Sequence, residues 1–251
     1  MPSLKSRMRS AVNWLIGHCG WEFRRIPPAF PPDFSLADIE DIRAVQQFTM
    51  TSAERIYALI RAVEYLVRHR IPGDVVECGV WKGGNIVTVA RMLLRMQDAD
   101  RHLWLFDTFD GMSEPGDVDV SYANQPARDY LKTNGADDWL RVPLEEVKKK
   151  VLSTGYDERK IHFVKGRVEE TLPLPRPPQI SLLRLDTDWY ESTRHELVHL
   201  FPHVVSGGVL IIDDYGHWRG AQKAVDEYFE NNRISILLNR IDYSARIGIK
   251  P

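Results

Sequence analysis

Two pairs of aspartates follow two apolar runs in the second half of the chain. The first run, LLRLDTDWY, contains Asp186 and Asp188, and the second, GGVLIIDDYG, ends in Asp213 and Asp214 about twenty-five residues later. Like charges that lie close together repel each other, so each pair carries an energetic cost that a bound cation would remove. For one pair considered alone, capping of a following helix or turn is the alternative.

A glycine-rich turn precedes both pairs, in the segment VVECGVWKGGN. Gly79 permits a tight turn after a buried strand, and Gly83 and Gly84 let a ligand or a helix approach the backbone. The spacing matches neither the dinucleotide-binding nor the Walker pattern, which argues against a cofactor bound through its phosphates. Glu77 suits a positively charged ligand group, and Asp107, at the end of the next strand, could accept hydrogen bonds from a ribose. S-adenosylmethionine, a cationic nucleoside without phosphate, meets this description.

The segments that must position these residues alternate between strands and helices. Residues 35–70 show helical spacing of apolar residues, with Ser52 as an N-cap. Five strand-like runs follow, DVVECGV, HLWLFDTF, KIHFVKG, ISLLRLD and GGVLIIDDY, together with the helical runs GNIVTVARMLLRM, STRHELVHLF and AQKAVDEYFE. This alternation predicts an α/β fold with a mostly parallel, doubly wound sheet. The tail ISILLNRIDYSARIGIK predicts a terminal antiparallel hairpin.

The chain divides into an arm and a main domain. Residues 1–34 combine a basic start with the proline-rich RRIPPAFPPDF and predict an N-terminal arm with an extended connector. We favour packing of this arm on its own domain or on a second subunit over a membrane-binding helix. Residues 35–251 form the expected enzymatic domain. Within it, residues 110–156 interrupt the alternation and predict a lid-like insertion, with surface decoration as the alternative.

Composition excludes several classes of protein. The formal net charge of −2 argues against a nucleic-acid binder that relies on a positive face. Cys19 and Cys78 are too few for a disulfide framework, so a reducing cytoplasm is the expected setting. No apolar run approaches the roughly 20 residues that a membrane-spanning helix needs.

Four motifs together resemble the macrocin O-methyltransferase family. They are IPGDVVECGVWKGG, LFDTFDGM, LLRLDTDWYEST and GGVLIIDDYGHWRGAQKAVDEYF, and the resemblance runs from Thr49 to Phe229. It implies a Rossmann-like class I methyltransferase fold, S-adenosylmethionine as the methyl donor and Mg²⁺ beside the methyl group. It also implies a sugar or sugar-bearing natural product as the acceptor, and it favours a homo-oligomer.

The resemblance implies roles residue by residue. Asp186, Asp213 and Asp214 match the metal ligands, with Asp186 also counted as catalytic, and Asp188 matches the general base. The residues that match the cofactor site are Thr49, Met50, Glu77, Gly79, Trp81, Asp107, Thr108, Phe109, Gly111, Gly166 and Arg167. The N-terminal arm, the tail after Asn231 and most of the insertion fall outside the resemblance, so the identity of the acceptor stays open.

Two other functions compete with this interpretation. A glycosyltransferase could use Asp186 and Asp188 as a D-x-D motif that holds a metal-bound nucleotide sugar, but Glu77 and the glycine turn would then have no role. A non-catalytic module could keep the cofactor fold for binding alone. Further candidates for an acceptor pocket are His217, Trp218 and Arg219, and also Trp189 and Tyr190, for which core packing is the alternative.

Overall fold

The structure is a computed structural model that describes residues 30–133, 140–173 and 176–251. The larger compact unit of the chain is Leu36–Pro251, and the architecture given below is that of this unit. The predicted N-terminal arm, residues 1–34, lies almost entirely outside the described residues. None of the described helices has both the length and the apolar character needed to span a membrane.

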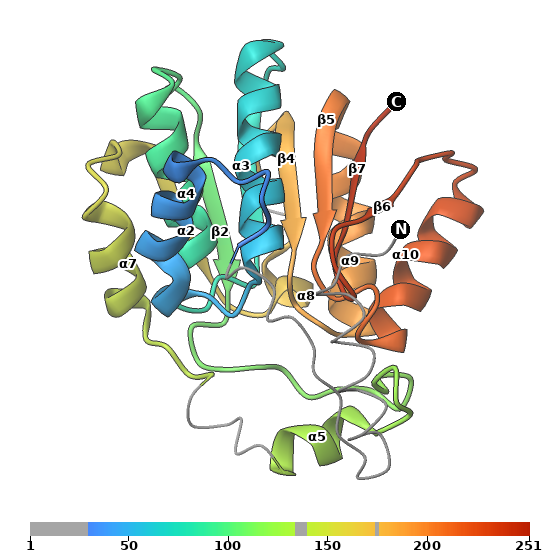
Figure 1. Cartoon of the computed structure of the whole chain (residues 1–251). Helices are drawn as coiled ribbons and strands as arrows, with labels where there is room; N and C mark the ends of the chain where they lie inside the picture. The colour runs from blue at the N-terminus through green and yellow to red at the C-terminus, as the bar shows by residue number, and fades with distance from the viewer. Residues whose placement is uncertain (1–29, 134–139, 174–175) are drawn as a thin grey trace, which may run out of the picture. The chain divides into compact units, whose positions relative to one another are not determined.

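A seven-stranded sheet forms the centre of this unit, in the order β3-β2-β1-β4-β5-β7-β6 (Figure 1). Five strands are parallel: β1 (Asp74–Cys78), β2 (Leu103–Asp107), β3 (Ile161–Lys165), β4 (Ile180–Leu185) and β5 (Val204–Ile212). Strands β6 (Asn239–Arg240) and β7 (Arg246–Ile249) are antiparallel, and β7 pairs with β5. The predicted α/β fold with a mostly parallel sheet and a terminal antiparallel hairpin is confirmed, although residues 234–238 of the expected hairpin are not strand.

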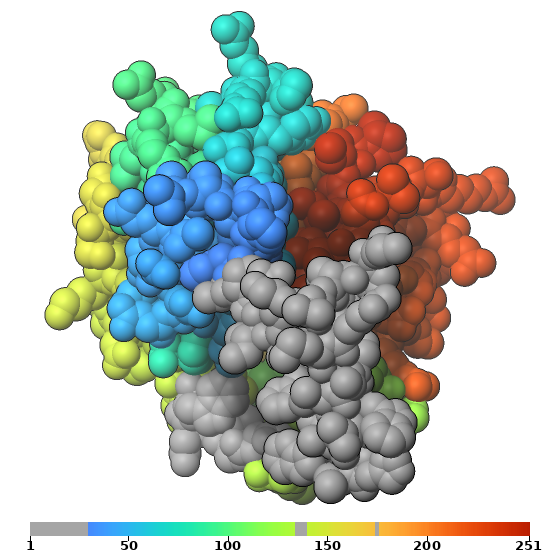
Figure 2. Space-filling view, in the orientation of Figure 1, coloured from blue at the N-terminus to red at the C-terminus, as the bar shows by residue number. Residues whose placement is uncertain are grey.

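The helices form two groups that cover the two faces of the sheet (Figure 1). One group consists of α2 (Leu36–Val45), α3 (Ala53–Arg68), α4 (Gly84–Arg95) and α7 (Leu144–Leu152), and the other of α8 (Val168–Thr171), α9 (Tyr190–Leu200) and α10 (Arg219–Asn231). Helix α5 (Ala127–Thr133) and the 3₁₀ turns η1 (Gln46–Phe48), η2 (Glu158–Lys160) and η3 (Phe201–His203) complete the elements. In Figure 2, the side chains of α2, α3 and α4 hide β1 and β2 from view.

Side chains of β4 alternate between these two helical layers. Leu183 and Leu185 belong to a core cluster with Leu197 of α9 and Val225 of α10. Because successive strand residues point to opposite faces, Arg184 lies on the face that α3 and α4 cover. Burial of each large apolar side chain stabilises the folded state by roughly 1.5–3 kcal/mol. A buried charged side chain in the same strand instead costs free energy unless an opposite charge pairs with it.

The insertion between β2 and β3 has two structurally different parts. Its second part contains α7, which packs against α4 through the buried Val147 and Val151 and so belongs to a helical layer. Its first part lies at the carboxyl end of the sheet, where Tyr122 N donates to the carbonyl oxygen of His217 at 2.8 Å. The lid-like function of the insertion stays a prediction.

Candidate active site

The turn after β1 brings its backbone against the end of β4. Gly79 has a φ of +81°, and a Cβ at this position would lie 2.0 Å from the carbonyl oxygen of Asp186. Its N–H donates to Phe106 O at 2.9 Å. Only glycine fits this conformation and this space. The predicted cofactor turn therefore touches the first predicted metal ligand directly.

Asp107 holds the same turn in shape. Its Oδ2 accepts from the backbone N–H groups of Val80 at 2.6 Å and Trp81 at 3.0 Å, and its Oδ1 accepts from Phe109 N at 2.7 Å. Trp81 and Phe109 both have positive φ angles, of 47° and 50°, so these hydrogen bonds support a backbone that non-glycine residues rarely adopt. Thr108 Oγ1 also donates to Asp107 Oδ1, at 3.4 Å, so all of the roughly four acceptor sites of the carboxylate are used. The predicted ribose contact would therefore replace one of these bonds, and it stays a prediction.

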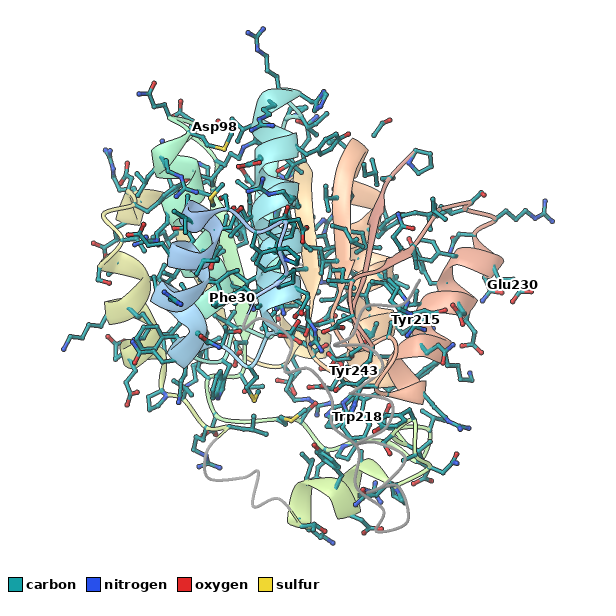
Figure 3. All side chains as sticks on the ribbon, in the orientation of Figure 1. Phe30, Asp98, Tyr215, Trp218, Glu230 and Tyr243 are labelled. Carbon is teal, nitrogen blue, oxygen red and sulfur yellow. The ribbon has the colours of Figure 1, made fainter. Side chains whose placement is uncertain are left out.

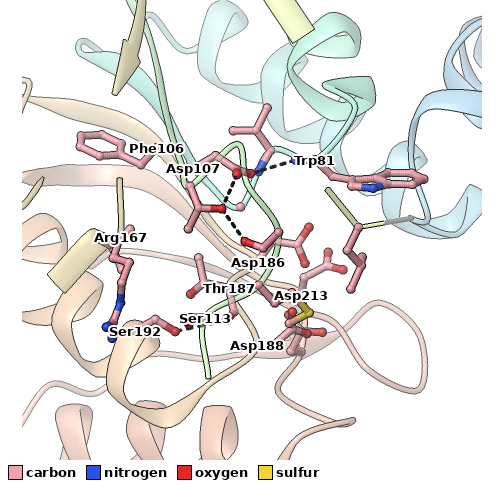
Figure 4. Close-up of a pocket in the computed structure, with 18 of the residues that line it drawn as sticks. Trp81, Phe106, Asp107, Ser113, Arg167, Asp186, Thr187, Asp188, Ser192 and Asp213 are labelled. Carbon is pink, nitrogen blue, oxygen red and sulfur yellow. Dashed lines mark hydrogen bonds between the residues drawn. The ribbon is translucent and has the colours of Figure 1, made fainter. Parts of the chain in front are cut away.

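One pocket gathers most of the predicted site residues (Figure 4). Asp107 and Trp81 lie at one end of it, and Asp186, Asp188 and Asp213 lie together at the other. The predicted residues in its lining are Thr49, Met50, Gly79, Trp81, Asp107, Thr108, Gly111, Gly166, Arg167, Asp186, Asp188, Asp213 and Asp214. Glu77 and Phe109 are absent from this lining, and their side chains are buried, at 2% and 4% exposure.

Loops on both sides of the pocket fix the remaining cofactor candidates. Gly166, with a φ of +141°, donates from its N–H to Asp107 O at 3.0 Å, which places Arg167 at the pocket. Thr49 Oγ1 accepts from Thr51 N at 3.0 Å in the segment that leads into α3. Ser52 caps that helix as predicted, since its Oγ accepts from Arg55 N.

Three aspartates meet where β4 and β5 end. The parallel pairing of these strands brings Asp186 beside Asp213 and Asp214, and one carboxylate oxygen of each lies within 4.8 Å of the others. Asp214 Oδ2 is buried and has no hydrogen-bond partner. Oxygen ligands grouped in this way are the donors that Mg²⁺ and Ca²⁺ prefer. The donor set and the unsatisfied buried oxygen therefore fit a hard divalent cation.

Burial dominates the electrostatics of this cluster. It raises the pKa of Asp186 well above its usual value, with Arg184 opposing the shift and Asp213 and Asp214 adding to it. The pKa of Asp214 is likewise raised well above its usual value, by burial and then by the charges of Asp188 and Asp213. Each of these shifts means that the cluster does not hold all its negative charges favourably without a compensating cation.

Asp188 occupies a strained turn between β4 and α9. Its φ is +68°, and its Oδ1 accepts from Trp218 Nε1 at 2.9 Å. The preceding Thr187 is fixed by donation from its Oγ1 to Glu196 Oε1 at 2.9 Å. Burial, followed by the charge of Asp186, raises the pKa of Asp188 to about 7. The turn thus points a carboxylate of raised pKa into the pocket beside the acid cluster.

Arg184 contacts the acid cluster and was missed by the sequence interpretation. Its guanidinium, at 3% side-chain exposure, donates to Glu77 Oε1 at 2.9 Å, to Asp186 Oδ2 at 2.7 Å and to Asp213 Oδ1 at 2.6 Å. A signal was present, because an arginine inside the apolar run ISLLRLD is costly unless it is paired. Glu77 therefore does not line the pocket. It is connected through Arg184 to Asp186 and Asp213, which do line it.

A second arginine reaches the cluster from α3. Arg55 Nη1 donates to Asp213 Oδ2, and Arg55 Nε donates to Asp242 Oδ2 at 2.6 Å. Ser244 Oγ donates to the carbonyl oxygen of Asp213 at 2.7 Å. The loop between β6 and β7 is thereby connected to the end of β5 and, through Arg55, to α3. The Arg55–Asp242 contact joins residues that lie 187 positions apart, which no local pattern could indicate.

The aromatic candidates for the acceptor differ in their exposure and contacts. Trp189 is 2% exposed and donates from Nε1 to Ser113 O at 2.8 Å, so it belongs to the core. His217 lies beside the half-exposed rings of Tyr122 and Tyr243, with ring centroids 5.6 and 5.9 Å away. Tyr122, His217 and Trp218 line a second groove next to the main pocket.

Comparison with known proteins gives one consistent result. The family model described as macrocin-O-methyltransferase (TylF) matches residues 37–247. A Streptomyces olivaceus enzyme named 8-demethyl-8-(2,3-dimethoxy-alpha-L-rhamnosyl)-tetracenomycin-C 4'-O-methyltransferase is 34% identical over 194 residues, which cover 77% of this chain and 72% of the relative. Demethyldecarbamoylnovobiocin O-methyltransferase of Streptomyces niveus is 34% identical over 181 residues, which cover 72% of this chain and 67% of the relative.

A solved structure agrees with these relatives. The O-methyltransferase NovP superposes with a TM-score of 0.70 at 31% sequence identity, over 84% of this chain and 88% of that chain. The sheet order found here and the pocket at the carboxyl ends of its strands are consistent with this similarity.

Proposed function

This chain belongs to the macrocin O-methyltransferase family and is an O-methyltransferase, and from that premise we propose that it methylates a hydroxyl of a sugar or a sugar-bearing small molecule, with S-adenosylmethionine as donor and Mg²⁺ as metal. The observation that carries this proposal is the meeting of the cofactor turn with the acid cluster in one pocket. Family membership decides against a glycosyltransferase and against a non-catalytic module.

The cofactor half of the pocket supports the choice of donor. Asp107 supplies carboxylate oxygens close to the turn, and Gly79 lets this turn lie against the carbonyl oxygen of Asp186. Trp81 and Met50 add aromatic and apolar surface to the pocket lining, and Arg167 lines the side opposite Trp81 (Figure 4). Acidic and apolar groups in this arrangement suit a cationic nucleoside better than a pyrophosphate.

The acid half of the pocket supports the choice of metal. Asp186, Asp213 and Asp214 would hold Mg²⁺, because they offer grouped carboxylate oxygens, one of them buried and unsatisfied. When bound, Mg²⁺ supplies Lewis-acid chemistry that lowers the pKa of an acceptor hydroxyl, and S-adenosylmethionine supplies the electrophilic methyl group. Calcium would accept the same ligands, so the identity of the ion belongs to the test below.

Asp188 would receive the proton of the acceptor hydroxyl at one of its carboxylate oxygens. The residue lines the pocket beside the three proposed ligands, and Trp218 Nε1 holds its Oδ1 in place. A general base acts only within hydrogen-bond reach of the proton that it removes, so this fixed orientation matters. Asp186 and Asp188 thus have separate roles, one in holding the metal and one in accepting the proton.

The acceptor class rests on the relatives. Their names specify a rhamnosyl-bearing tetracenomycin and a novobiocin derivative as substrates of those enzymes. The groove with Tyr122, His217 and Trp218 offers aromatic surface beside the pocket, which suits the apolar face of a sugar ring. A homo-oligomeric state stays a prediction from the resemblance.

Calorimetry tests the donor and the metal separately. We expect S-adenosylhomocysteine to bind both the wild-type protein and an Asp213→Asn, Asp214→Asn variant, whereas a Mg²⁺ signal disappears only in the variant. Methyl transfer to a panel of rhamnosides would then identify the acceptor. Absence of S-adenosylhomocysteine binding to the wild-type protein would contradict the proposed donor, and equal Mg²⁺ signals in both proteins would contradict the proposed ligands.

A further inference from the structure

Arg184 links the acid of the cofactor turn to two of the acids proposed to bind the metal. Its Nη1 is shared between Glu77 and Asp186, and its Nη2 binds Asp213. Nη2 also donates to Thr51 Oγ1 at 3.3 Å, and Asn85 Oδ1, with the amide in its favoured orientation, accepts from Nη1 and Nη2 at 3.2 Å. The guanidinium therefore contacts five side chains. Among the residues that the structure describes, no other arginine forms a hydrogen bond or an ion pair with Glu77 or Asp186.

The sheet itself sets the position of this guanidinium. Glu77 and Arg184 are direct neighbours in the pairing of β1 with β4, and Arg184 pairs with Ile211 of β5. Asp213 N donates to Leu185 O at 2.9 Å, which continues the same ladder. Because these partners belong to central strands, the charged contacts have little freedom to rearrange.

A divalent cation at the acid cluster and the guanidinium of Arg184 would compete for the same carboxylate groups. Both are positive, and both interact with Asp186 and Asp213. At separations of a few ångströms in a buried site, repulsion between like charges is strong, and it doubles for a divalent ion. Removal of either cation alone leaves buried carboxylates uncompensated, which destabilises the fold.

We propose that Arg184 is a resident counter-ion, a positioning residue that holds Glu77, Asp186 and Asp213 together in the metal-free protein and thereby weakens the binding of a divalent cation. This inference rests on the metal site of the proposed function. The carboxylates are thus held together before a metal binds. Because the guanidinium already offsets part of their negative charge, they attract a divalent cation less strongly.

Arg101 offers a matched control at the opposite end of the sheet. Its side chain is 9% exposed, and it donates to Asp98 Oδ2 and to the carbonyl oxygens of Ile71 and Gly73, each at 2.8 Å. It is therefore a buried, fully engaged arginine whose partners lie outside the acid cluster. A merely structural role for Arg184 predicts that the two arginines respond alike to Mg²⁺.

The experiment compares the full-length wild-type protein with Arg184→Gln, Arg184→Lys and Arg101→Gln. Each protein is freed of metal with EDTA, dialysed and titrated with Mg²⁺ by calorimetry and by thermal unfolding. We expect Arg184→Gln to have a lower Tm without metal, a larger rise of Tm with Mg²⁺ than wild type, and a Kd for Mg²⁺ that is tighter by about tenfold or more. Arg184→Lys keeps the charge and should stay within about threefold of wild type, whereas Arg101→Gln should lose Tm with an unchanged Mg²⁺ response.

Each outcome decides between the alternatives. A Mg²⁺ response of Arg184→Gln that is equal to or smaller than that of wild type overturns the inference, even if the Tm is lower. An Arg184→Gln protein that folds only with Mg²⁺ supports it, and one that folds in neither condition overturns it, because the ion then does not replace the guanidinium. A wild-type protein that binds S-adenosylhomocysteine but shows no Mg²⁺ response overturns the proposed metal site together with this inference.

Discussion

The carboxylates at the two ends of the central sheet differ in how completely they are hydrogen-bonded. At the carboxyl end, Glu77, Asp186 and Asp213 share the guanidinium groups of Arg184 and Arg55, and the buried atoms Glu77 Oε2 and Asp214 Oδ2 have no hydrogen-bond partner. At the amino end, Asp74 accepts from His102 N at 3.0 Å and from Trp104 Nε1 at 3.1 Å, one bond for each oxygen.

This contrast separates an acid with a hydrogen bond at each oxygen from acids that have an oxygen without a partner. A satisfied buried carboxylate is explained by the structure around it, whereas an unsatisfied one in a pocket requires another partner. In Figure 3 the two ends of the sheet can be located from Asp98, near the amino end, and from Trp218 and Tyr243, near the carboxyl end. Matched substitutions at the two ends can test this contrast.

The largest effect is expected from Asp188→Asn, which keeps the shape of the side chain and removes the proton acceptor. The kcat for methyl transfer should fall by about 10²–10⁴-fold, with affinity for S-adenosylhomocysteine close to wild type. Asp74→Asn at the amino end should leave kcat within about twofold and lower only the stability, by about 1 kcal/mol. An Asp188→Asn enzyme that keeps most of its kcat would remove Asp188 from the chemistry.

The second largest effect is expected from substitution of Gly79, compared with Gly155, which has the same φ angle. Gly79 and Gly155 both have a φ of +81°, but a Cβ at Gly79 would overlap Asp186 O, whereas nothing lies within 4 Å of one at Gly155. Gly79→Ala should cost about 3 kcal/mol or more in the free energy of unfolding and weaken S-adenosylhomocysteine binding. Gly155→Ala should cost about 1–2 kcal/mol with unchanged binding. Equal losses in chemical denaturation would show that strain alone, and not the close approach, determines the result.

The stability of the metal-free protein should depend on pH because of buried carboxyl groups at the carboxyl end of the sheet. Burial, opposed by Arg184, raises the pKa of Glu77 to about 7, and burial raises that of Asp188 to about 7. Since both folded-state values lie above those of the unfolded chain, the folded protein binds more protons between about pH 4 and pH 7. The stabilisation is therefore complete at low pH and is lost as the pH rises through about 7.

We accordingly expect the Tm in EDTA to fall between pH 6 and pH 8, and the fall to be smaller with saturating Mg²⁺. Thermal unfolding monitored by circular dichroism at constant ionic strength would measure both series. A Tm that rises over this range in EDTA would contradict the assignment of these shifts to buried carboxyl groups.

The smallest effect is expected from the tryptophan that orients Asp188. Trp218→Phe keeps the ring and removes the Nε1–H donor, so kcat should fall by about tenfold, the value of one hydrogen bond to a charged group. Trp189→Phe removes the donor to Ser113 O and should affect stability alone. If both variants lose kcat equally, the bond to Asp188 has no specific role in catalysis.

Much of this architecture follows from local patterns. Apolar runs with period two and amphipathic helices with period 3.6 predict the alternating elements, and the parallel arrangement then brings every strand's carboxyl end to one edge. This is why Asp107, Asp186 and Asp213 could be placed in one site from the sequence. The same reasoning placed Glu77 in the pocket, although the structure shows that Glu77 does not line it and instead accepts a hydrogen bond from Arg184.

The sequence by itself determined which residue types stand at the carboxyl ends of the strands, because strand boundaries depend on neighbours along the chain. Only the tertiary structure decided how their charges are shared, since the partners of Arg184 and Arg55 lie more than a hundred residues away in several cases. Strand register brings Glu77 to Arg184, and the loop after β6 brings Asp242 to Arg55. Electrostatic interaction depends on distance in space and burial, and neither quantity can be read from a linear pattern of residues.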